Sequence, residues 1–116
     1  MAKLDMEGPF PLNDAEIDRQ VTRKSPGNYG LGYTKDNGTF IVEYVGRSDD
    51  DVNNRLHDWT GKKYKKFKYS YAANAKEAYE KECRNYHDFG GSDDLDNDIH
   101  PARPSGTSLK CPVCNH

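Results

Sequence analysis

Two short stretches of alternating apolar and small or polar residues predict a β-hairpin. The apolar positions are Tyr29, Leu31 and Tyr33 in the first stretch, and Phe40, Val42 and Tyr44 in the second. A period of two is typical of half-buried strands. The dipeptide Asn37-Gly38 lies between them and strongly favours a hairpin turn. The pattern therefore predicts two antiparallel strands.

The length of the turn leaves two strand registers open. A four-residue loop over residues 35–38 pairs Thr34 with Thr39 and places Tyr29 opposite Tyr44. A two-residue loop instead places Tyr29 opposite Gly46. The parity is the same in both registers, so both phenols lie on one sheet face. They are then either a cross-strand aromatic pair or part of a polar site.

Helical spacing predicts three helices. Asn13 is a suitable N-cap for a short helix over about residues 14–22. A second helix follows Gly46 and has Ser48 or Asp49 as its cap. Its buried face holds Val52, Leu56 and Trp59, while Arg55 lies at the edge of that face and His57 on the opposite side. A third helix, capped by Asn74, is expected over about residues 75–88.

A third strand is predicted between the second and third helices. Its aromatic residues Phe67, Tyr69 and Tyr71 alternate with Lys66, Lys68 and Ser70. The basic face either binds a phosphate backbone or protects an edge strand from pairing. Five lysines gather in this region and form the candidate nucleic-acid surface: Lys62, Lys63, Lys65, Lys66 and Lys68.

The composition indicates one small domain with a modest core. The chain has 116 residues, of which 34% are hydrophobic and 31% charged, with a net charge of −2. Positive charge is gathered in the lysine region and negative charge in residues 49–51 and 93–98. The sequence has no apolar run of membrane-spanning length and no signal-peptide pattern. Three cysteines, two of them in a Cys-x-x-Cys pair, favour a reducing, cytoplasmic setting.

One carboxylate stands out on the third predicted helix. Glu82 shares its inward stripe with Ala78, Tyr79 and Tyr86. Burying a carboxylate is unfavourable unless it is paired or binds a metal. Glu77 and Glu80 are expected to face solvent, so Glu82 is the candidate functional acid.

Four features in order resemble the GIY-YIG nuclease superfamily: Gly27-Asn28-Tyr29, Tyr44-Val45-Gly46, Arg55 and Glu82. The resemblance covers roughly residues 27–88. It implies an α+β fold with a small three-stranded antiparallel sheet flanked by helices. Three departures are present: Asn28 replaces an apolar residue, Trp59 stands where some members have histidine, and the segment from Gly46 to Arg55 is one residue longer.

The resemblance also implies an activity, the metal-dependent hydrolysis of DNA phosphodiester bonds. Glu82 would hold Mg²⁺ or Mn²⁺, and Tyr29, directly or through Tyr44, would help to activate the attacking water. Arg55 would stabilise charge on the phosphate. A polar residue near the end of the family domain is sometimes part of the site, and either Asn97 or His100 is expected to take this role.

A second, structural metal site is predicted from the cysteines. Cys83 and His87 are four residues apart on one helix face, and Cys111 and Cys114 form a Cys-x-x-Cys pair. Together they make a Cys₃His set, which suits structural Zn²⁺. His100 and His116 are alternatives to His87. Without zinc, Cys83 would be a small buried hydrophobe and His87 would cap the helix.

These predictions divide the chain into three parts. Residues 1–24 form a tail and a short helix, 25–89 the GIY-YIG-like nuclease domain, and 90–116 a polar loop with the zinc-tied Cys-x-x-Cys segment packed on the domain. DNA is the expected partner, with no membrane association. Two alternatives remain open: a non-catalytic nucleic-acid-binding module of the same fold, and a zinc-stabilised protein-interaction domain.

Overall fold

The fold is a four-stranded antiparallel sheet with three α-helices, in strand order β1-β4-β2-β3. A computed structural model describes residues 4–97, 101, 102, 104, 107 and 109–113. In chain order the elements are β1 (Glu7–Pro11), α1 (Asp14–Gln20), β2 (Gly27–Thr34), β3 (Phe40–Ser48), α2 (Val52–His57), β4 (Lys66–Tyr71), α3 (Ala75–Asp88) and the short 3₁₀ helix η1 (Gly91–Asp93).

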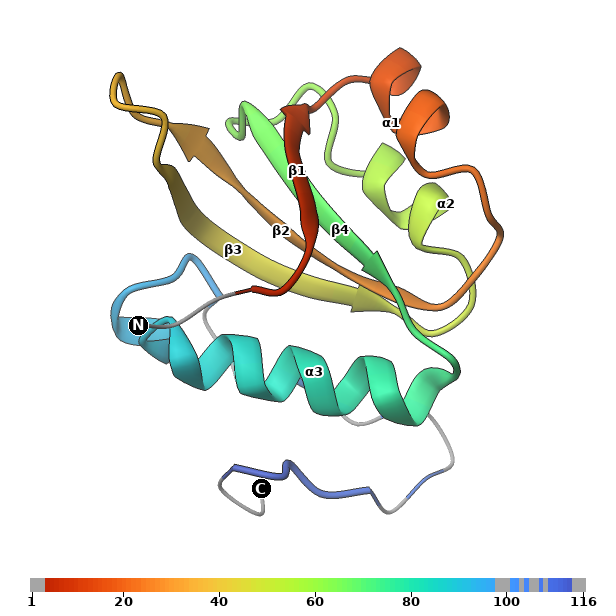
Figure 1. The fold of residues 1–116 in the computed structure, drawn as a ribbon. Helices are drawn as coiled ribbons and strands as arrows, with labels where there is room; N and C mark the ends of the chain where they lie inside the picture. The colour runs from red at the N-terminus through yellow and green to blue at the C-terminus, as the bar shows by residue number, and fades with distance from the viewer. Residues whose placement is uncertain (1–3, 98–100, 103, 105–106, 108, 114–116) are drawn as a thin grey trace.

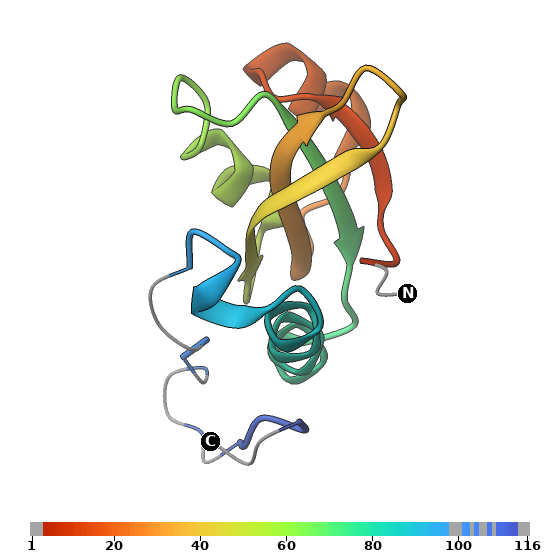
Figure 2. The ribbon, with the colours of Figure 1, turned by 90° about the vertical axis from the view of Figure 1, so that its left-hand side faces the viewer.

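The helices cover both faces of the twisted sheet (Figures 1 and 2). α1 and α2 lie together over one face, and α3 crosses the other. The first face buries a core centred on Ile17, Leu31, Leu56 and Phe67. The α3 side buries a smaller cluster that includes Val45 and Tyr86. Apolar residues are therefore buried on both faces of the sheet, in two separate clusters.

The predicted helices and the three predicted strands are present. α3 has the expected bounds, and Asn74 caps it by accepting a hydrogen bond from the Glu77 amide at 2.9 Å. α1 ends at Gln20, two residues earlier than expected. The cap of α2 was predicted wrongly: Asp51 accepts from the Asn54 amide, while Ser48 Oγ accepts from the amides of Asp50 and Asp51.

The sheet has a fourth strand that the sequence did not reveal. Residues of the predicted tail form β1, which pairs with β4. Its Glu-Gly-Pro-Phe-Pro sequence hides the strand, because Pro9 and Pro11 lack amide hydrogens and interrupt the usual pattern. An edge strand tolerates them, since it needs hydrogen bonds on one side only.

The position of β1 removes one interpretation of the lysines. Because β4 lies between β1 and β2, it is an interior strand and needs no protection against edge pairing. Phe67 and Tyr69 are buried, as the alternation predicted, and they pack in the core on the α2 side. Lys66 and Lys68 are half-buried on the alternate face, where the Lys68 ammonium lies 5.4 Å from the centre of the Phe40 ring.

The hairpin follows the shorter-loop register at its open end, but near the turn it has neither of the two predicted registers. Tyr29 faces Gly46, as the shorter loop requires, yet Thr34 pairs with Phe40 and the Lys35 amide bonds to the Thr39 carbonyl. A β-bulge opposite Leu31 and Gly32 absorbs the extra residue of β3. The bulge reverses the facing of β3 residues. Phe40 and Val42 consequently pack on the α3 side, whereas Tyr44 packs on the α2 side with Tyr29.

The segment after η1 covers the open edge of β3. The Asp96 amide bonds to the Glu43 carbonyl at 2.6 Å. Asn97 bonds to both backbone groups of Val45, accepting from its amide at 3.0 Å and donating to its carbonyl at 2.8 Å. These contacts satisfy backbone groups that an edge strand leaves unpaired. Across the described residues, no helix has the length and hydropathy of a membrane span.

Candidate functional site

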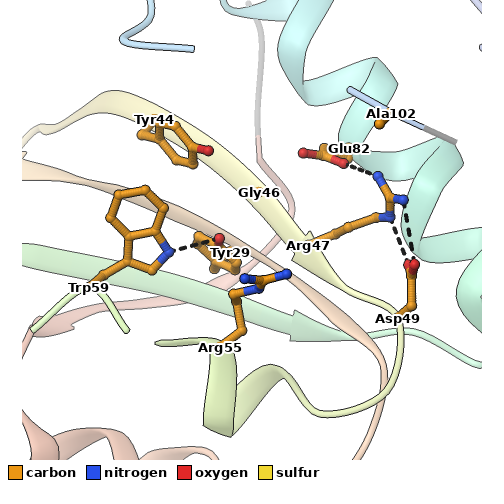
Figure 3. Close-up of a pocket in the computed structure, with 9 residues that line it drawn as sticks. All are labelled: Tyr29, Tyr44, Gly46, Arg47, Asp49, Arg55, Trp59, Glu82 and Ala102. Atoms are coloured by element: carbon orange, nitrogen blue, oxygen red, sulfur yellow. Dashed lines mark hydrogen bonds and ion pairs between the residues drawn. The ribbon is translucent and has the colours of Figure 1, made fainter. Parts of the chain in front are cut away.

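A polar pocket lies at the edge of β3, where the two sides of the sheet meet (Figure 3). Its volume is about 290 Å³. The lining residues are Tyr29, Tyr44, Gly46, Arg47, Asp49, Arg55, Trp59, Glu82 and Ala102. All four predicted catalytic residues are among them, contributed by β2, β3, α2 and α3. Residues far apart in the sequence are thus brought to one site.

Tyr29 is held at the base of the pocket by Trp59. The indole Nε1 donates a hydrogen bond of 2.9 Å to Tyr29 Oη. An indole nitrogen is only a donor, so the Tyr29 oxygen is the acceptor and its own proton is directed elsewhere. Burial raises the pKa of Tyr29 above its ordinary value, and the bond from Trp59 opposes this rise. Trp59 therefore positions the phenol and favours negative charge on its oxygen.

Gly46 permits the close approach of the Tyr29 ring. The two residues are cross-strand partners, and a Cβ atom on Gly46 would overlap the ring and hydroxyl of Tyr29. The last residue of the Tyr-Val-Gly triplet thus has a steric role. It lets Tyr29 lie across β3 and present its hydroxyl to the pocket.

Tyr44 is half-buried and more accessible than Tyr29. Its ring centre lies 4.6 Å from that of Trp59, and its hydroxyl points into the pocket (Figure 3). Burial, and next the negative charge of Glu82, raise its pKa, while Arg55 lowers it. Glu82 and Arg55 therefore act on the pKa of both phenols, Glu82 raising it and Arg55 lowering it.

Arg55 lies on the rim of the pocket. Its side chain is 53% exposed and forms a loose ion pair of 3.7 Å with Asp58. The guanidinium extends from α2 toward Tyr29 (Figure 3). The extra residue between Gly46 and Arg55 has not moved this arginine away from the pocket. An exposed guanidinium facing a pocket is suited to an anionic ligand.

Glu82 is buried and ion-paired with a residue that sequence reasoning missed. Arg47 Nη1 lies 2.6 Å from Glu82 Oε1, and Arg47 Nε lies 2.7 Å from Asp49 Oδ1. The guanidinium is also 5.2 Å from the centre of the Tyr79 ring. The alternation of the strand could have identified this residue. Arg47 follows the buried Val45 by two residues, so both side chains lie on the α3 side of the sheet. Arg47 and Asp49 belong to the site.

Opposing effects act on the Glu82 carboxyl. Burial raises its pKa, whereas the adjacent Arg47 guanidinium lowers it, and burial outweighs the guanidinium. In Figure 3 the second carboxylate oxygen points away from Arg47, toward the side of the pocket formed by Tyr44. Glu82 is thus tied through one oxygen and presents the other to the pocket.

The donor set suits a magnesium-like ion that relies on substrate and water for most of its ligands. Within the described part of the chain, no three His, Cys, Asp or Glu side chains are grouped as a metal cage. Mg²⁺ commonly binds one or two carboxylates and completes its coordination with water and phosphate oxygens. The second oxygen of Glu82 meets this minimum.

The lysines do not line the pocket. Lys63 is exposed and pairs with Asp96 at 2.7 Å, and Lys62 and Lys65 are exposed in the loop before β4. Tyr64, within this loop, is 5.8 Å from Trp59 and 6.2 Å from Tyr44 between ring centres. The loop therefore borders the aromatic residues of the pocket without entering it.

Asn97, one of the two candidate polar residues near the end of the domain, does not line the pocket. Asn97 is bonded to the backbone of Val45, and His100 lies outside the described residues. The side-chain amide of Asn97 therefore has a structural role: it satisfies the backbone groups at the edge of β3.

The predicted zinc ligands are described in part. Cys83 and Cys111 are fully buried and their thiols hydrogen bond. Burial and then the bond with Cys111 raise the pKa of Cys83 to about 12. His87 lies one turn after Cys83 on α3. Cys114 and the alternative ligand His116 fall outside the described residues.

No protein-family model, no curated protein and no solved structure shows a significant match to this chain.

Proposed function

We propose that this protein is a metal-dependent endonuclease that hydrolyses DNA phosphodiester bonds in the pocket at Glu82. The observation that carries the proposal is the convergence of the four predicted catalytic residues on one polar pocket from four elements. Packing does not require this arrangement, because a core gains nothing from a guanidinium and a carboxylate beside two phenols. The resemblance in residue order supports the same activity.

Arg55 and the two tyrosines have different roles in the proposed reaction. Arg55, exposed at the rim, binds a phosphate oxygen and stabilises the charge that develops in the transition state. The Tyr29 oxygen accepts from Trp59, so its proton is available to a water or to Tyr44. Tyr44, the more accessible phenol, positions the attacking water through a hydrogen bond to its hydroxyl.

Glu82 is the proposed metal ligand, through the oxygen that Arg47 does not bind. A bound Mg²⁺ or Mn²⁺ supplies Lewis-acid neutralisation of phosphate charge. Arg47 opposes the effect of burial on the Glu82 pKa and fixes the direction of the carboxylate, and Asp49 holds Arg47 from its other side. Arg47 and Asp49 are therefore positioning residues in this proposal.

A cleavage assay with purified protein tests the proposal. Duplex, branched and single-stranded DNA are incubated with Mg²⁺ or Mn²⁺ and the products are separated on denaturing gels. We expect one of these substrates to be cut. Glu82→Gln and Tyr29→Phe should each lower the rate by roughly 10²-fold or more, because each removes a group acting on the transition state.

Two matched variants serve as controls. Glu80→Gln changes a carboxylate on the same helix, and Tyr33→Phe changes an exposed tyrosine on the same strand. Neither residue lines the pocket, so both variants should cut at the wild-type rate. Absence of cleavage on every substrate, or equal cutting by Glu82→Gln, would contradict the proposed activity.

The Arg47–Glu82 ion pair favours one alternative, a non-catalytic nucleic-acid-binding module. Arg47 already provides a positive charge to the carboxylate, and a pocket that binds phosphate through Arg55 needs no metal. The same variants separate the two functions. DNA binding that survives Glu82→Gln and falls with Arg55→Ala, without cleavage of any substrate, would support the binding module.

A further inference from the structure

We propose that a second pocket, where β4 leads into α3, binds a small zwitterion: a molecule that carries an ammonium and a carboxylate group, as free amino acids do. This pocket shares no lining residue with the one at Glu82. The proposed site goes beyond the nuclease activity and does not depend on it. Its starting point is a buried amide oxygen that has no hydrogen-bond partner among the described residues.

Three parts of the chain form the walls of the second pocket (Figure 1). Asn28 comes from β2, Tyr71 and Ala72 from the end of β4 and the residue after it, and two glutamates and two basic residues from α3. The charges of the lining side chains therefore balance. The volume is about 250 Å³. Pockets for drug-sized ligands usually measure roughly 300–1,000 Å³, so a smaller molecule is expected here.

Asn28 provides a hydrogen-bond acceptor. Its side chain is fully buried, and Nδ2 donates to the Ala78 carbonyl of α3 at 2.8 Å. Only the amide nitrogen can donate to a carbonyl, so this bond fixes which side-chain atom is the oxygen. That oxygen, Oδ1, is the atom without a partner in the described part of the chain. A buried acceptor without a partner is unfavourable, so this wall of the pocket favours a ligand with an N–H or O–H group.

Lys81 and Arg84 provide neighbouring positive charges. The Lys81 ammonium donates to Ser70 Oγ at 2.9 Å and to the Asp5 carbonyl at 2.7 Å, which leaves one of its three hydrogens. Burial lowers the pKa of Lys81, the Asp5 carboxylate raises it, and the positive charge of Arg84 lowers it again. Arg84 is exposed and has no ion-pair partner among the described residues. A carboxylate ligand would relieve the repulsion between the two cations and can accept two hydrogen bonds from a guanidinium.

Glu77 provides negative charge near Asn28. It lies in the first turn of α3, one turn before Lys81 and on the same face. Its Oε2 accepts from the Ala73 amide at 3.1 Å, which occupies one of its two carboxylate oxygens. Asn28 is bonded to Ala78, the residue after Glu77. The amide oxygen and this carboxylate are therefore at the same end of the pocket, where an ammonium could donate to both.

The order of these groups along α3 identifies the class of ligand. The acceptors of Asn28 and Glu77 lie near the start of the helix, and the cations of Lys81 and Arg84 follow one and two turns later. A simple anion would leave Asn28 Oδ1 without a donor. A simple amine would add a third positive charge beside the two cations. A zwitterion, with its ammonium toward Asn28 and its carboxylate toward Arg84, meets both requirements.

A nuclear magnetic resonance titration of the full chain tests the site. Nitrogen-15-labelled protein is titrated with glycine, β-alanine and 4-aminobutyrate, in which the two charges are progressively further apart. At least one of them should shift the side-chain amide signals of Asn28 and the backbone amides of Ala72 and Glu77 saturably, with a dissociation constant of roughly 1 mM or below. Acetate and methylammonium each carry one of the two charges and should bind at least about tenfold more weakly.

A matched pair of variants assigns the binding to this pocket. Arg84→Gln should weaken binding of the zwitterion roughly tenfold or more, because charge-assisted hydrogen bonds are lost. Arg84 is exposed, so the variant should fold. Lys76→Gln also removes an exposed positive charge from α3, but Lys76 does not line the pocket, and this control should bind as wild type.

Three results would overturn the proposed site. Equally tight binding of acetate would show a site for simple anions. Equal weakening by Arg84→Gln and Lys76→Gln would show that only the net charge of α3 matters. Absence of a saturable shift with every zwitterion would mean that water alone satisfies Asn28. None of these measurements uses DNA or Glu82, so the outcome of the cleavage assay leaves them unaffected.

Discussion

Arg47 places one guanidinium between two carboxylates, Asp49 just beyond its own strand and Glu82 on α3. Both members of the Arg47–Glu82 pair have side chains only 11% exposed. Removal of either partner leaves the other charge in a poorly hydrated place. The pair therefore joins β3 to α3 at the point where the pocket forms.

A double-mutant cycle on this pair should show strong coupling. Arg47→Met and Glu82→Met are each expected to lower the free energy of unfolding by about 1–3 kcal/mol, because each leaves a buried charged partner unsatisfied. The double variant should be destabilised by less than the sum, with a coupling energy above roughly 1 kcal/mol. Urea denaturation monitored by circular dichroism measures the free energy of unfolding of the wild type, the two single variants and the double variant.

The Arg55–Asp58 pair is the natural comparison for this cycle. It is exposed and its atoms are 3.7 Å apart. Its coupling energy, measured with Arg55→Met and Asp58→Met, should stay below about 0.5 kcal/mol. Equal coupling in the two pairs would show that burial of Arg47 and Glu82 is not what strengthens their interaction.

Asn28 differs from the pattern of the superfamily that the sequence resembles, yet it does not affect the pocket at Glu82. It is fully buried, and its Nδ2 donates to the Ala78 carbonyl of α3 at 2.8 Å. As the neighbour of Tyr29 in a strand, it faces the opposite side of the sheet. Asn28 therefore helps to attach α3 to the sheet and does not alter the position of Tyr29 in the pocket.

Among the elements, α1 and α2 are joined by a histidine that responds to pH. His57 Nδ1 is 2.6 Å from Asp14 Oδ1, and Nε2 is 2.9 Å from Asp18 Oδ1. Partial burial lowers the pKa of His57, but the two carboxylates raise it by more, so the net shift is upward. In turn, the bond from His57 is the main cause that lowers the pKa of Asp18.

Stability from this contact should decline as the pH rises. The folded state holds the His57 proton more tightly than the unfolded state, so the contribution is complete below about pH 6.5. It is lost as the pH passes through the raised pKa of the folded state. The difference in unfolding free energy between wild type and His57→Gln should therefore be larger at about pH 6 than at about pH 9.

Thermal or urea unfolding across this pH range measures that difference. Asp14→Asn and Asp18→Asn should each reduce the pH dependence, because each removes one carboxylate that faces the imidazole. A difference that grows with pH would contradict the assignment of a protonated His57 between the two aspartates.

At the scale of the whole molecule, charge is separated between a mixed pocket and a basic loop. The pocket holds two arginines and two carboxylates, so it gives little net attraction to DNA. Lys62 and Lys65 are exposed and Lys66 is half-exposed, in or next to the loop whose Tyr64 contacts the aromatic wall of the pocket. If DNA is the substrate, these lysines should bind its backbone beside the cleavage site.

This arrangement predicts a change in the salt dependence of DNA binding. Replacing Lys62, Lys65 and Lys66 by glutamine should weaken binding and reduce the slope of log K against log salt by roughly 0.9 for each phosphate that is no longer neutralised. Fluorescence anisotropy at several salt concentrations measures the slope. The control carries glutamine at the exposed Lys24, Lys35 and Lys76, which lie elsewhere. An equal weakening in both variants would mean that only net charge matters.

The sequence by itself determined most of the elements and the facing of several site residues. Alternation predicted β2, β3 and β4, and helical spacing predicted α3 with Glu82 inward and α2 with Arg55 at its edge. These features follow from local periodicity, because a strand or helix must turn its apolar face to the core wherever the core lies. The resemblance then predicted which of these residues would share a site.

Only the tertiary structure decided the edges of the sheet and the partners of charged groups. The proline-containing β1 becomes a strand because β4 offers it an edge, and the bulge in β3 sends Phe40 and Tyr44 to opposite faces. The ion pair of Arg47 with Glu82 joins residues with no local relation in the chain. Strand register, bulges and long-range ion pairs depend on which segments contact each other in the folded protein. The periodicity within one segment does not contain this information.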